Sequence, residues 1–179
     1  SIILSKQKFD VILLLGDRFE MATAALTIIP FKIPIIHFHG GSITTGSFDD
    51  NYRHAITKLS NFHMVETSNH KKRIIQMGEN KKNIKVIGAP SLSFLKKFKW
   101  LDFNKICKEF KISRQKFIIL TIHPETNEDK NYNIKLIKHT LKSINKYPGK
   151  VIITSPNGDI YNNIILEEYD KFYKLNKNK

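Results

Sequence analysis

Residues 10–17 read DVILLLGD, a run of five aliphatic side chains that ends at a glycine and an aspartate. A short apolar run bounded in this way is typical of a strand buried in a parallel sheet. Three similar runs follow, in residues 33–41 (IPIIHFHGG), 61–68 (NFHMVETS) and 83–90 (NIKVIGAP). The alternation of strands and helices predicts an α/β domain with Rossmann-like parallel strands, covered by helices on both faces.

Segments with helical spacing of apolar residues separate these strands. Helices are predicted over 18–32, over 50–60 with Asp49 or Asp50 as the N-cap, and over 69–77, where Gly78 closes the helix. A polar residue or glycine follows each strand, and in parallel sheets ligands bind at the carboxyl ends of the strands. We therefore expect an active cleft at this edge of the sheet.

The pattern breaks after Pro90 and then starts again. Strands are predicted in KFIILTIHP (116–124) and KVIITSPNGD (150–159), each followed by a helix. Residues 1–95 are interpreted as the C-terminal part of a first Rossmann-like domain, 96–115 as a linker, and 116–179 as the N-terminal part of a second. Because two strands are too few for a stable open sheet and the chain starts at Ser1, an incomplete protein is expected.

The composition excludes several classes of protein. The net charge is +14, but the lysines are spread along the whole chain and no nucleic-acid-binding motif occurs, so no nucleic-acid partner is predicted. No apolar run is long enough to cross a membrane. A single cysteine, Cys107, cannot form an internal disulfide and fits the reducing cytoplasm.

Asp17 and Arg18 follow the first strand. Asp17 is interpreted either as a helix N-cap or as a general base at the mouth of a cleft. Arg18 suits an anionic group such as a phosphate, although a surface ion pair explains it equally well.

His37 and His39 are predicted to share one face of the second strand, because side chains alternate along a strand. Three alternatives are open: structural support of one histidine by the other, acid–base catalysis, or a metal site with Asp49, Asp50 and His54. Gly40 and Gly41 allow a close backbone approach, either to a ligand or in a tight turn.

Asp49, Asp50, Arg53 and His54 lie at a predicted helix N-terminus, which favours anions. At least one of Arg53 and His54 is expected to point into the cleft. In the second domain, His123 ends a strand and is interpreted as a cleft residue or as a structural histidine. The SPNGD stretch that contains Asn157 is also compatible with an ordinary turn.

Together, GDRFE, IPIIHFHGGSITTGSFDDNYRHAITKLS, VIGAPSL, TIHPET and SPNGD resemble the hydrolysing UDP-N-acetylglucosamine 2-epimerases of bacterial sialic and legionaminic acid synthesis. The resemblance implies a two-domain glycosyltransferase-B-like architecture, here incomplete. It also implies conversion of UDP-N-acetylglucosamine to N-acetylmannosamine and UDP, through C2 deprotonation, elimination of UDP and hydration. UDP-N,N'-diacetylbacillosamine is the alternative substrate, and a metal-dependent hydrolase or an inactive sugar-nucleotide-binding fragment are alternative functions.

The resemblance implies roles for residues at matching positions. No metal or other cofactor is implied, and a homodimer is expected for the full-length protein. Many relatives have a glutamate where this chain has Ser42. The implied catalytic residues are Asp17, His39, Asp49 and His123, with His123 a candidate acid for the departing UDP, and the implied substrate-binding residues are Arg18, Gly40, Gly41, Asp50, Arg53, His54 and Asn157.

Overall fold

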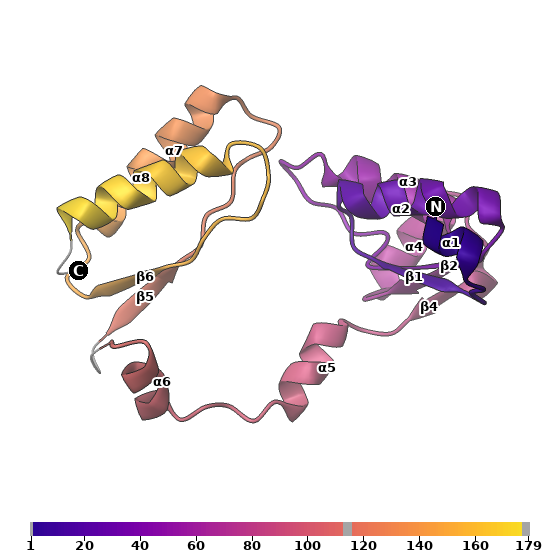
Figure 1. The fold of residues 1–179 in the computed structure, drawn as a ribbon, viewed down its shortest axis with the longest axis horizontal. Coiled ribbons are helices and arrows are strands. Elements are labelled where there is room, and N and C mark those ends of the chain that lie inside the picture. Colours follow the sequence, from indigo (N-terminus) through magenta and orange to yellow (C-terminus); the bar gives the residue numbers. More distant parts are fainter. Residues whose placement is uncertain (1, 113–115, 177–179) are drawn as a thin grey trace. The chain divides into compact units, whose positions relative to one another are not determined.

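The structure, a computed structural model, describes residues 2–112 and 116–176 (Figure 1). Contacts divide the chain into two compact units, residues 1–98 and 99–179, which are described separately. The domain limits given above stay a prediction, and the last residues of the predicted linker, 113–115, lie outside the described part. Every described helix is too short or too polar to cross a bilayer.

The first unit is built on a parallel sheet of four strands in the order β1-β2-β3-β4. The predicted strands and connecting helices are confirmed: the strands and the first of these helices are shorter than predicted, and the other two helices begin one residue earlier. The strands are β1 (Ile12–Leu15), β2 (Ile35–Phe38), β3 (Phe62–Val65) and β4 (Ile84–Val86). The helices are α1 (Ile2–Lys6), α2 (Phe19–Ile28), α3 (Asp49–Leu59), α4 (Ser68–Gln76) and α5 (Pro90–Lys97), with short 3-10 turns at Ile29–Phe31 and Lys81–Asn83.

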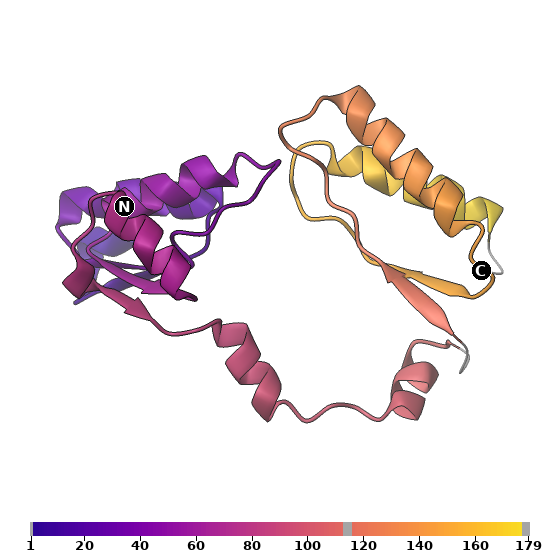
Figure 2. The same ribbon diagram turned by 180° about the vertical axis from the view of Figure 1, so that it is seen from behind.

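The strand order explains where the helices lie. Crossovers between parallel strands are right-handed, so strands added in one direction place all their helices on one face. α2 and α3 accordingly lie side by side over the sheet (Figures 1 and 2). Residues of α2, α3 and α4 pack against strand side chains on this face. One cluster contains Leu14, Ala22, Ala25, Ile28, Ile35 and Ile56, and another contains Val65, Ile74 and Ile84.

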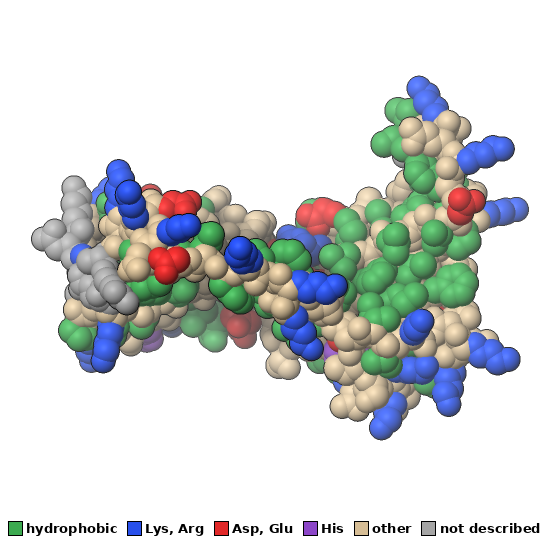
Figure 3. Space-filling view, turned by 90° about the horizontal axis from the view of Figure 1, so that it is seen from below, with side chains coloured by type: hydrophobic (Ala, Val, Ile, Leu, Met, Phe, Trp, Pro, Cys, Tyr) green, Lys and Arg blue, Asp and Glu red, His purple; other side chains and the backbone are tan. Residues whose placement is uncertain are grey.

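The prediction that helices cover both faces is wrong for the described residues. On the opposite face, Leu13 is paired in register with Ile36, and Ile36 with Phe62. Leu13, Leu15 and Phe62 are 59%, 60% and 42% exposed. Hydrophobic side chains gather visibly on the first unit in Figure 3. The continuous apolar run in β1 therefore indicates a two-sided apolar strand, although only one side is packed here.

This open apolar face leads to a first prediction. The 179-residue chain is expected to bind the dye ANS and to self-associate, because contiguous exposed apolar patches drive association. Replacing Leu13 and Leu15 by threonine, which keeps strand propensity, should reduce both effects. Leu26→Thr on α2 is the matched control, since Leu26 is equally exposed at 62% but is not part of the sheet face. Equal effects of the two changes would contradict a sheet-face patch.

The second unit has two parallel strands, β5 (Phe117–Leu120) and β6 (Lys150–Ile153), connected by α7 (Lys130–Ile144) and followed by α8 (Asn162–Leu175). α7 and α8 pack together, and their core contains Leu120, Ile137, Leu141, Ile165 and Tyr169. The short helix α6 (Phe103–Glu109) belongs to this unit, and its Phe103 ring stacks on Phe117 with centroids 6.2 Å apart.

Candidate functional site

Arg53 is the centre of the polar network at the carboxyl ends of β1 and β2. It lies in the first half of α3, and its side chain is only 3% exposed. The guanidinium forms ion pairs with Asp17, which follows β1, and with Asp50, in the first turn of α3. Two segments that are far apart in sequence are thereby joined through one cation.

The guanidinium uses all its donors within the protein. Nε and Nη2 donate to Asp17 Oδ2, and Nη1 donates to Asp50 Oδ1. Nη1 also donates to the Ser42 carbonyl at 3.1 Å, and Nη2 to Thr44 Oγ1 at 2.9 Å. Arginine has five N–H donors, so none is left over for a ligand while this network stands. Arg53 therefore holds the two carboxylates and the loop after β2 in place.

The predicted N-cap of this helix is wrong. Phe48 occupies the N-cap position, and no side chain caps it. The Asp50 carboxylate instead accepts from the Thr44 N–H at 3.0 Å and binds Arg53, while Asp49 Oδ2 accepts from Ser47 Oγ at 2.7 Å. Asp17 is not a cap either, because Arg18 occupies the N-cap of α2. The carboxylates are thus used for ion pairing and loop closure, and not for capping.

His37 is a structural residue of the core. It is fully buried, its Nε2 donates to the Gly16 carbonyl at 2.8 Å, and its Nδ1 lies 3.1 Å from Thr57 Oγ1. Burial lowers the pKa of His37 to about 4, because the charged ring loses hydration, and the Gly16 carbonyl offsets only part of that loss. His37 therefore supports the ends of β1 and α3 as a neutral ring.

His39 does not share a face with His37, contrary to the expected alternation. β2 ends at Phe38, and His39 has a φ of +67°, a left-handed conformation that turns the chain out of the strand. Its backbone N–H donates to the Met64 carbonyl at 3.2 Å, and its Nδ1 contacts Glu66 Oε1. The imidazole is therefore directed at the end of β3 and not at the helical core.

Glu66, the polar residue that follows the third strand, was given no specific role from the sequence. Besides His39, it has His70 as a neighbour, with His70 Nδ1 2.9 Å from Glu66 Oε2. The three side chains are 20–28% exposed. The signal was present in the sequence, since Glu66 directly follows β3, the neighbour of β2. Its partner was hidden because the left-handed turn at His39 cannot be deduced from residue type alone.

Packing explains both glycines of the HGG turn. A Cβ on Gly40 would lie 3.0 Å from His37 Nδ1 and from Thr57 Oγ1. A Cβ on Gly41, at φ +79°, would lie 2.5 Å from the His70 carbonyl oxygen. The Gly41 carbonyl accepts a hydrogen bond from Arg73 Nη1. Gly40 and Gly41 were explained either by close approach to a ligand or by a tight turn. The tight turn is sufficient, because the turn is packed closely against α4.

Gly41→Ala is expected to lower the free energy of unfolding by more than about 2 kcal/mol, because backbone strain adds to a collision with backbone atoms. Gly16→Ala is the matched control: its φ is +92°, but nothing lies within 4 Å of the added Cβ. It should cost only the strain, about 1 kcal/mol. Urea unfolding followed by circular dichroism measures both, and equal losses would contradict the close packing of the turn.

In the second unit, the structure brings His123 and Asn157 together at the ends of β5 and β6. The Asn157 N–H donates to His123 Nδ1 at 3.0 Å, and the Asn157 amide contacts the Asp159 carboxylate. Buried Asn133 fixes the loop that follows His123: its side chain accepts from the Glu125 N–H at 2.9 Å and donates to the Glu125 carbonyl at 3.1 Å. SPNGD is therefore more than a surface turn, since it orients the histidine.

Comparison with known proteins is decisive for the family. The sequence model of the UDP-N-acetylglucosamine 2-epimerase family matches residues 1–178. The chain belongs to this family. It is 34% identical over 175 residues to the GDP/UDP-N,N'-diacetylbacillosamine 2-epimerase (hydrolyzing) of Campylobacter jejuni subsp. jejuni serotype O:2, covering 96% of this chain and 45% of that protein. It is 35% identical over 164 residues to the UDP-N,N'-diacetylbacillosamine 2-epimerase (hydrolyzing) of Legionella pneumophila, covering 91% of this chain and 43% of that protein.

The fold agrees with solved structures of the epimerase family. The crystal structure of the Neisseria meningitidis UDP-GlcNAc 2-epimerase bound to UDP-GlcNAc superposes with a TM-score of 0.72 at 20% identity, covering 96% of this chain and 49% of that chain. This likeness confirms the predicted α/β class with Rossmann-like parallel sheets and glycosyltransferase-B-like architecture. The chain spans less than half the length of the curated epimerases it matches.

The other predicted site residues of this epimerase-family chain lie outside the two networks. Arg18 pairs with Glu20 at 3.4 Å and is 40% exposed. His54 Nδ1 is buried and has no hydrogen-bond partner among the residues that the structure describes. Within residues 2–112 and 116–176, no group of three or more His, Cys, Asp or Glu side chains is arranged to hold a metal ion, so the alternative site at His37, His39, Asp49, Asp50 and His54 is not assembled.

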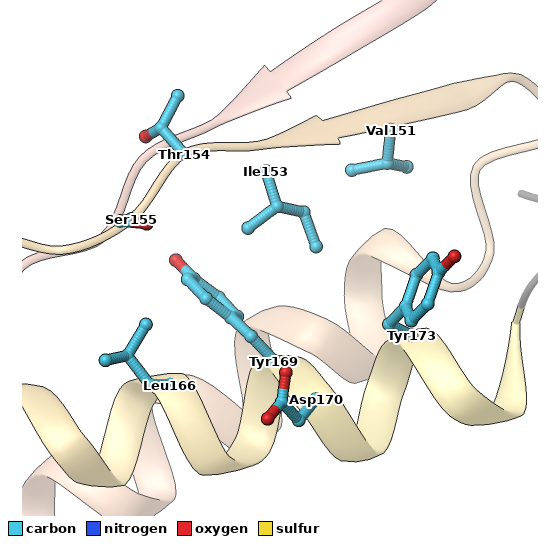
Figure 4. Close-up of a pocket in the computed structure, with 8 residues that line it drawn as sticks. All are labelled: Val151, Ile153, Thr154, Ser155, Leu166, Tyr169, Asp170 and Tyr173. Carbon is cyan, nitrogen blue, oxygen red and sulfur yellow. The ribbon is translucent and has the colours of Figure 1, made fainter.

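The second unit of this epimerase-family chain also has a cavity of about 370 Å³ between β6 and α8. Figure 4 shows Tyr169 and Tyr173 pointing from α8 toward the strand. None of the predicted site residues lines this cavity, so it is kept apart from the candidate site. Its lining residues are Val151, Ile153, Thr154, Ser155, Leu166, Tyr169, Asp170 and Tyr173.

Proposed function

We propose that this chain carries catalytic and substrate-binding groups of a hydrolysing 2-epimerase that acts on a UDP-sugar. The observation that carries the proposal is the Asp17–Arg53–Asp50 network at the carboxyl ends of β1 and β2, in a chain of this family. Such a network fixes carboxylates where ligands bind in parallel sheets. No cofactor is part of the proposal, and a cytoplasmic location and a homodimer of the full-length protein stay predictions.

The proposed reaction has three steps. A base removes the C2 proton of the sugar, and the bond between C1 and the diphosphate oxygen breaks with its electron pair, releasing UDP and a glycal. Water then adds, with a proton to the opposite face of C2 and hydroxide to C1, which gives the free 2-epimeric sugar. Carboxylates and imidazoles are the groups that proteins use for such proton transfers. The proposed participants are Asp17, His39 and Asp49 at the sugar and His123 at the departing diphosphate.

The proposed binding residues differ in how they would contribute. Arg53 supports Asp17 and Asp50, since its donors are occupied within the protein. Arg18 is 40% exposed and pairs with Glu20 at 3.4 Å, and a guanidinium of this kind suits a diphosphate. Gly40 and Gly41 shape the turn, while His54 and Asn157 complete the proposed set.

The sugar has two candidates. UDP-N-acetylglucosamine corresponds to the family description, and UDP-N,N'-diacetylbacillosamine corresponds to the names of the Campylobacter and Legionella relatives. Both carry a 2-acetamido group next to the anomeric carbon, so the same chemistry at C1 and C2 applies to each. Parallel assays with the two UDP-sugars distinguish them by which one gives UDP.

The proposal is tested with the 179-residue chain and with the complete product of its gene. Each is incubated with either UDP-sugar in heavy water, and released UDP and deuterium at C2 of the product are measured. Asp17→Asn should reduce turnover of the active protein by roughly 10²-fold or more, because it removes a proposed acid–base group. Asp10→Asn, at an exposed position before β1, is the matched control. If the complete gene product releases no UDP and incorporates no deuterium at C2, the proposal is wrong. Binding of UDP in calorimetry without turnover would instead favour a sugar-nucleotide-binding fragment.

A further inference from the structure

Two histidines, His39 in the first unit and His123 in the second, have opposite partners at the same ring atom. His39 Nδ1 contacts a carboxylate oxygen of Glu66. His123 Nδ1 lies 3.0 Å from a backbone nitrogen, that of Asn157. An ionised carboxylate only accepts hydrogen bonds, and a backbone N–H only donates them. Nδ1 of His39 must therefore carry a proton and donate, whereas Nδ1 of His123 must be unprotonated and accept.

We propose that His39 and His123 are held as opposite tautomers, selected by Glu66 and by the Asn157 N–H, so that His39 is a proton acceptor and His123 a neutral hydrogen-bond donor. In the neutral ring of His39, the proton lies on Nδ1 and the lone pair of Nε2 is available. In His123, Nδ1 accepts, so the proton lies on Nε2. In a neutral histidine, the hydrogen bond that one ring nitrogen makes determines whether the other nitrogen carries the proton.

The surroundings of His39 fit a proton acceptor. When Nε2 takes up a proton, the imidazolium that forms is already paired with the Glu66 carboxylate, which His70 Nδ1 approaches from the other side at 2.9 Å. The backbone that carries the ring is held in place, because the His39 N–H donates to the Met64 carbonyl and Gly41, two residues further on, is packed against α4. Glu66 is therefore a positioning residue that acts through His39.

The surroundings of His123 fit a donor that keeps its proton. Full transfer of the Nε2 proton would leave both ring nitrogens without one, and protonation of Nδ1 would break the bond from Asn157. A nucleoside diphosphate leaves as a stable anion, so it requires stabilisation of its charge and not a proton. These roles rest on the proposed function. In the first unit, His39 Nε2 takes the C2 proton while the electron pair of the C1–O bond leaves with the diphosphate. In the second unit, the His123 Nε2–H suits a hydrogen bond to an anionic diphosphate oxygen.

Nitrogen-15 NMR of the ring nitrogens tests the tautomers directly in the 179-residue chain. Spectra recorded across pH, up to pH values where the rings are neutral, distinguish nitrogens that carry a proton from those that do not. The expected result is a protonated Nδ1 and bare Nε2 in His39, with the reverse in His123. The opposite form of either ring, or a mixture like that of a free imidazole, would overturn the proposal.

Matched variants identify the selecting groups. Glu66→Ala should shift His39 toward the mixture of a free imidazole, while Glu20→Ala, which removes an exposed carboxylate on α2, should not. Asn157→Ala keeps the backbone N–H and should leave the His123 tautomer unchanged. Asn157→Pro removes this donor, so His123 should shift toward the tautomer mixture of a free imidazole. If Asn157→Pro does not fold, the spectrum of the unaltered chain still decides. Because the spectra need no turnover, failure of this proposal is distinguishable from failure of the proposed function.

Discussion

Replacing Arg53 by alanine is expected to lower the free energy of unfolding of the first unit by about 3–5 kcal/mol, because it leaves partly buried carboxylates without a cation. Asp17 and Asp50 are 30% and 26% exposed, so water compensates only in part. The loop carbonyl of Ser42 also loses its donor. Arg53→Lys should recover part of the loss, since an ammonium keeps the charge but cannot form the bidentate fork.

The measurement uses the division of the chain into two units. Urea unfolding followed by circular dichroism gives the overall loss, and hydrogen exchange with mass spectrometry locates it. Faster exchange is expected within residues 1–98, while residues 99–179 should remain unchanged as an internal control. Arg18→Ala is the matched variant, because its 40% exposed ion pair with Glu20 contributes at most about 1 kcal/mol. If Arg53→Ala lowered the free energy of unfolding by no more than Arg18→Ala does, the network would contribute little to stability.

Acidification is expected to destabilise the first unit through His37. The pKa of His37 is about 4 in the folded chain, whereas an unfolded histidine titrates near its ordinary value of 6.5. Between these values the unfolded state binds a proton that the folded state does not, so stability is complete above about pH 6.5 and falls as the pH decreases toward 4. From pH 7.5 to pH 5 the loss is about 2 kcal/mol, and it approaches about 3 kcal/mol near pH 4.

A second buried histidine acts in the same direction. Burial lowers the pKa of His63, although Glu79 opposes the shift, so protonation of His63 also favours unfolding. Urea unfolding at pH 5 and at pH 7.5 measures the sum. His37→Gln should reduce the pH dependence by about 2 kcal/mol over this interval, whereas His139→Gln on the exposed side of α7 should leave it unchanged. An unaltered slope in His37→Gln would contradict the assignment to His37.

Much of the fold was accessible from the sequence, because strand and helix patterns are local. The runs around Leu14, Ile36 and Ile119 predicted parallel strands, and Gly78 predicted the end of α4, where its φ is +92°. Which faces of the sheet are covered by helices could not be predicted from the sequence, since this depends on strand order, and strand order depends on pairing between distant segments. An apolar run also has the same composition whether one or both of its faces are packed.

The site was predicted as a set of residues rather than as a geometry. Asp17, Asp50 and Arg53 were each identified, but the closed network among them depends on how the loop after β2 folds back to α3. Glu66 was overlooked as a site residue because its partner, His39, reaches it only through a left-handed backbone conformation. Residue types at strand ends thus indicate where chemistry lies, while the hydrogen bonds that assign roles require coordinates.

The clamp around Arg53 also has a consequence for synthesis of the chain. Its bonds join residues no more than 36 positions apart, and all of its members lie between Asp17 and Arg53. Chains are made from the N-terminus and tend to fold unit by unit as they emerge. The two carboxylates can therefore be fixed by Arg53 on the ribosome before His123 has been translated, so that this network forms independently of the second unit.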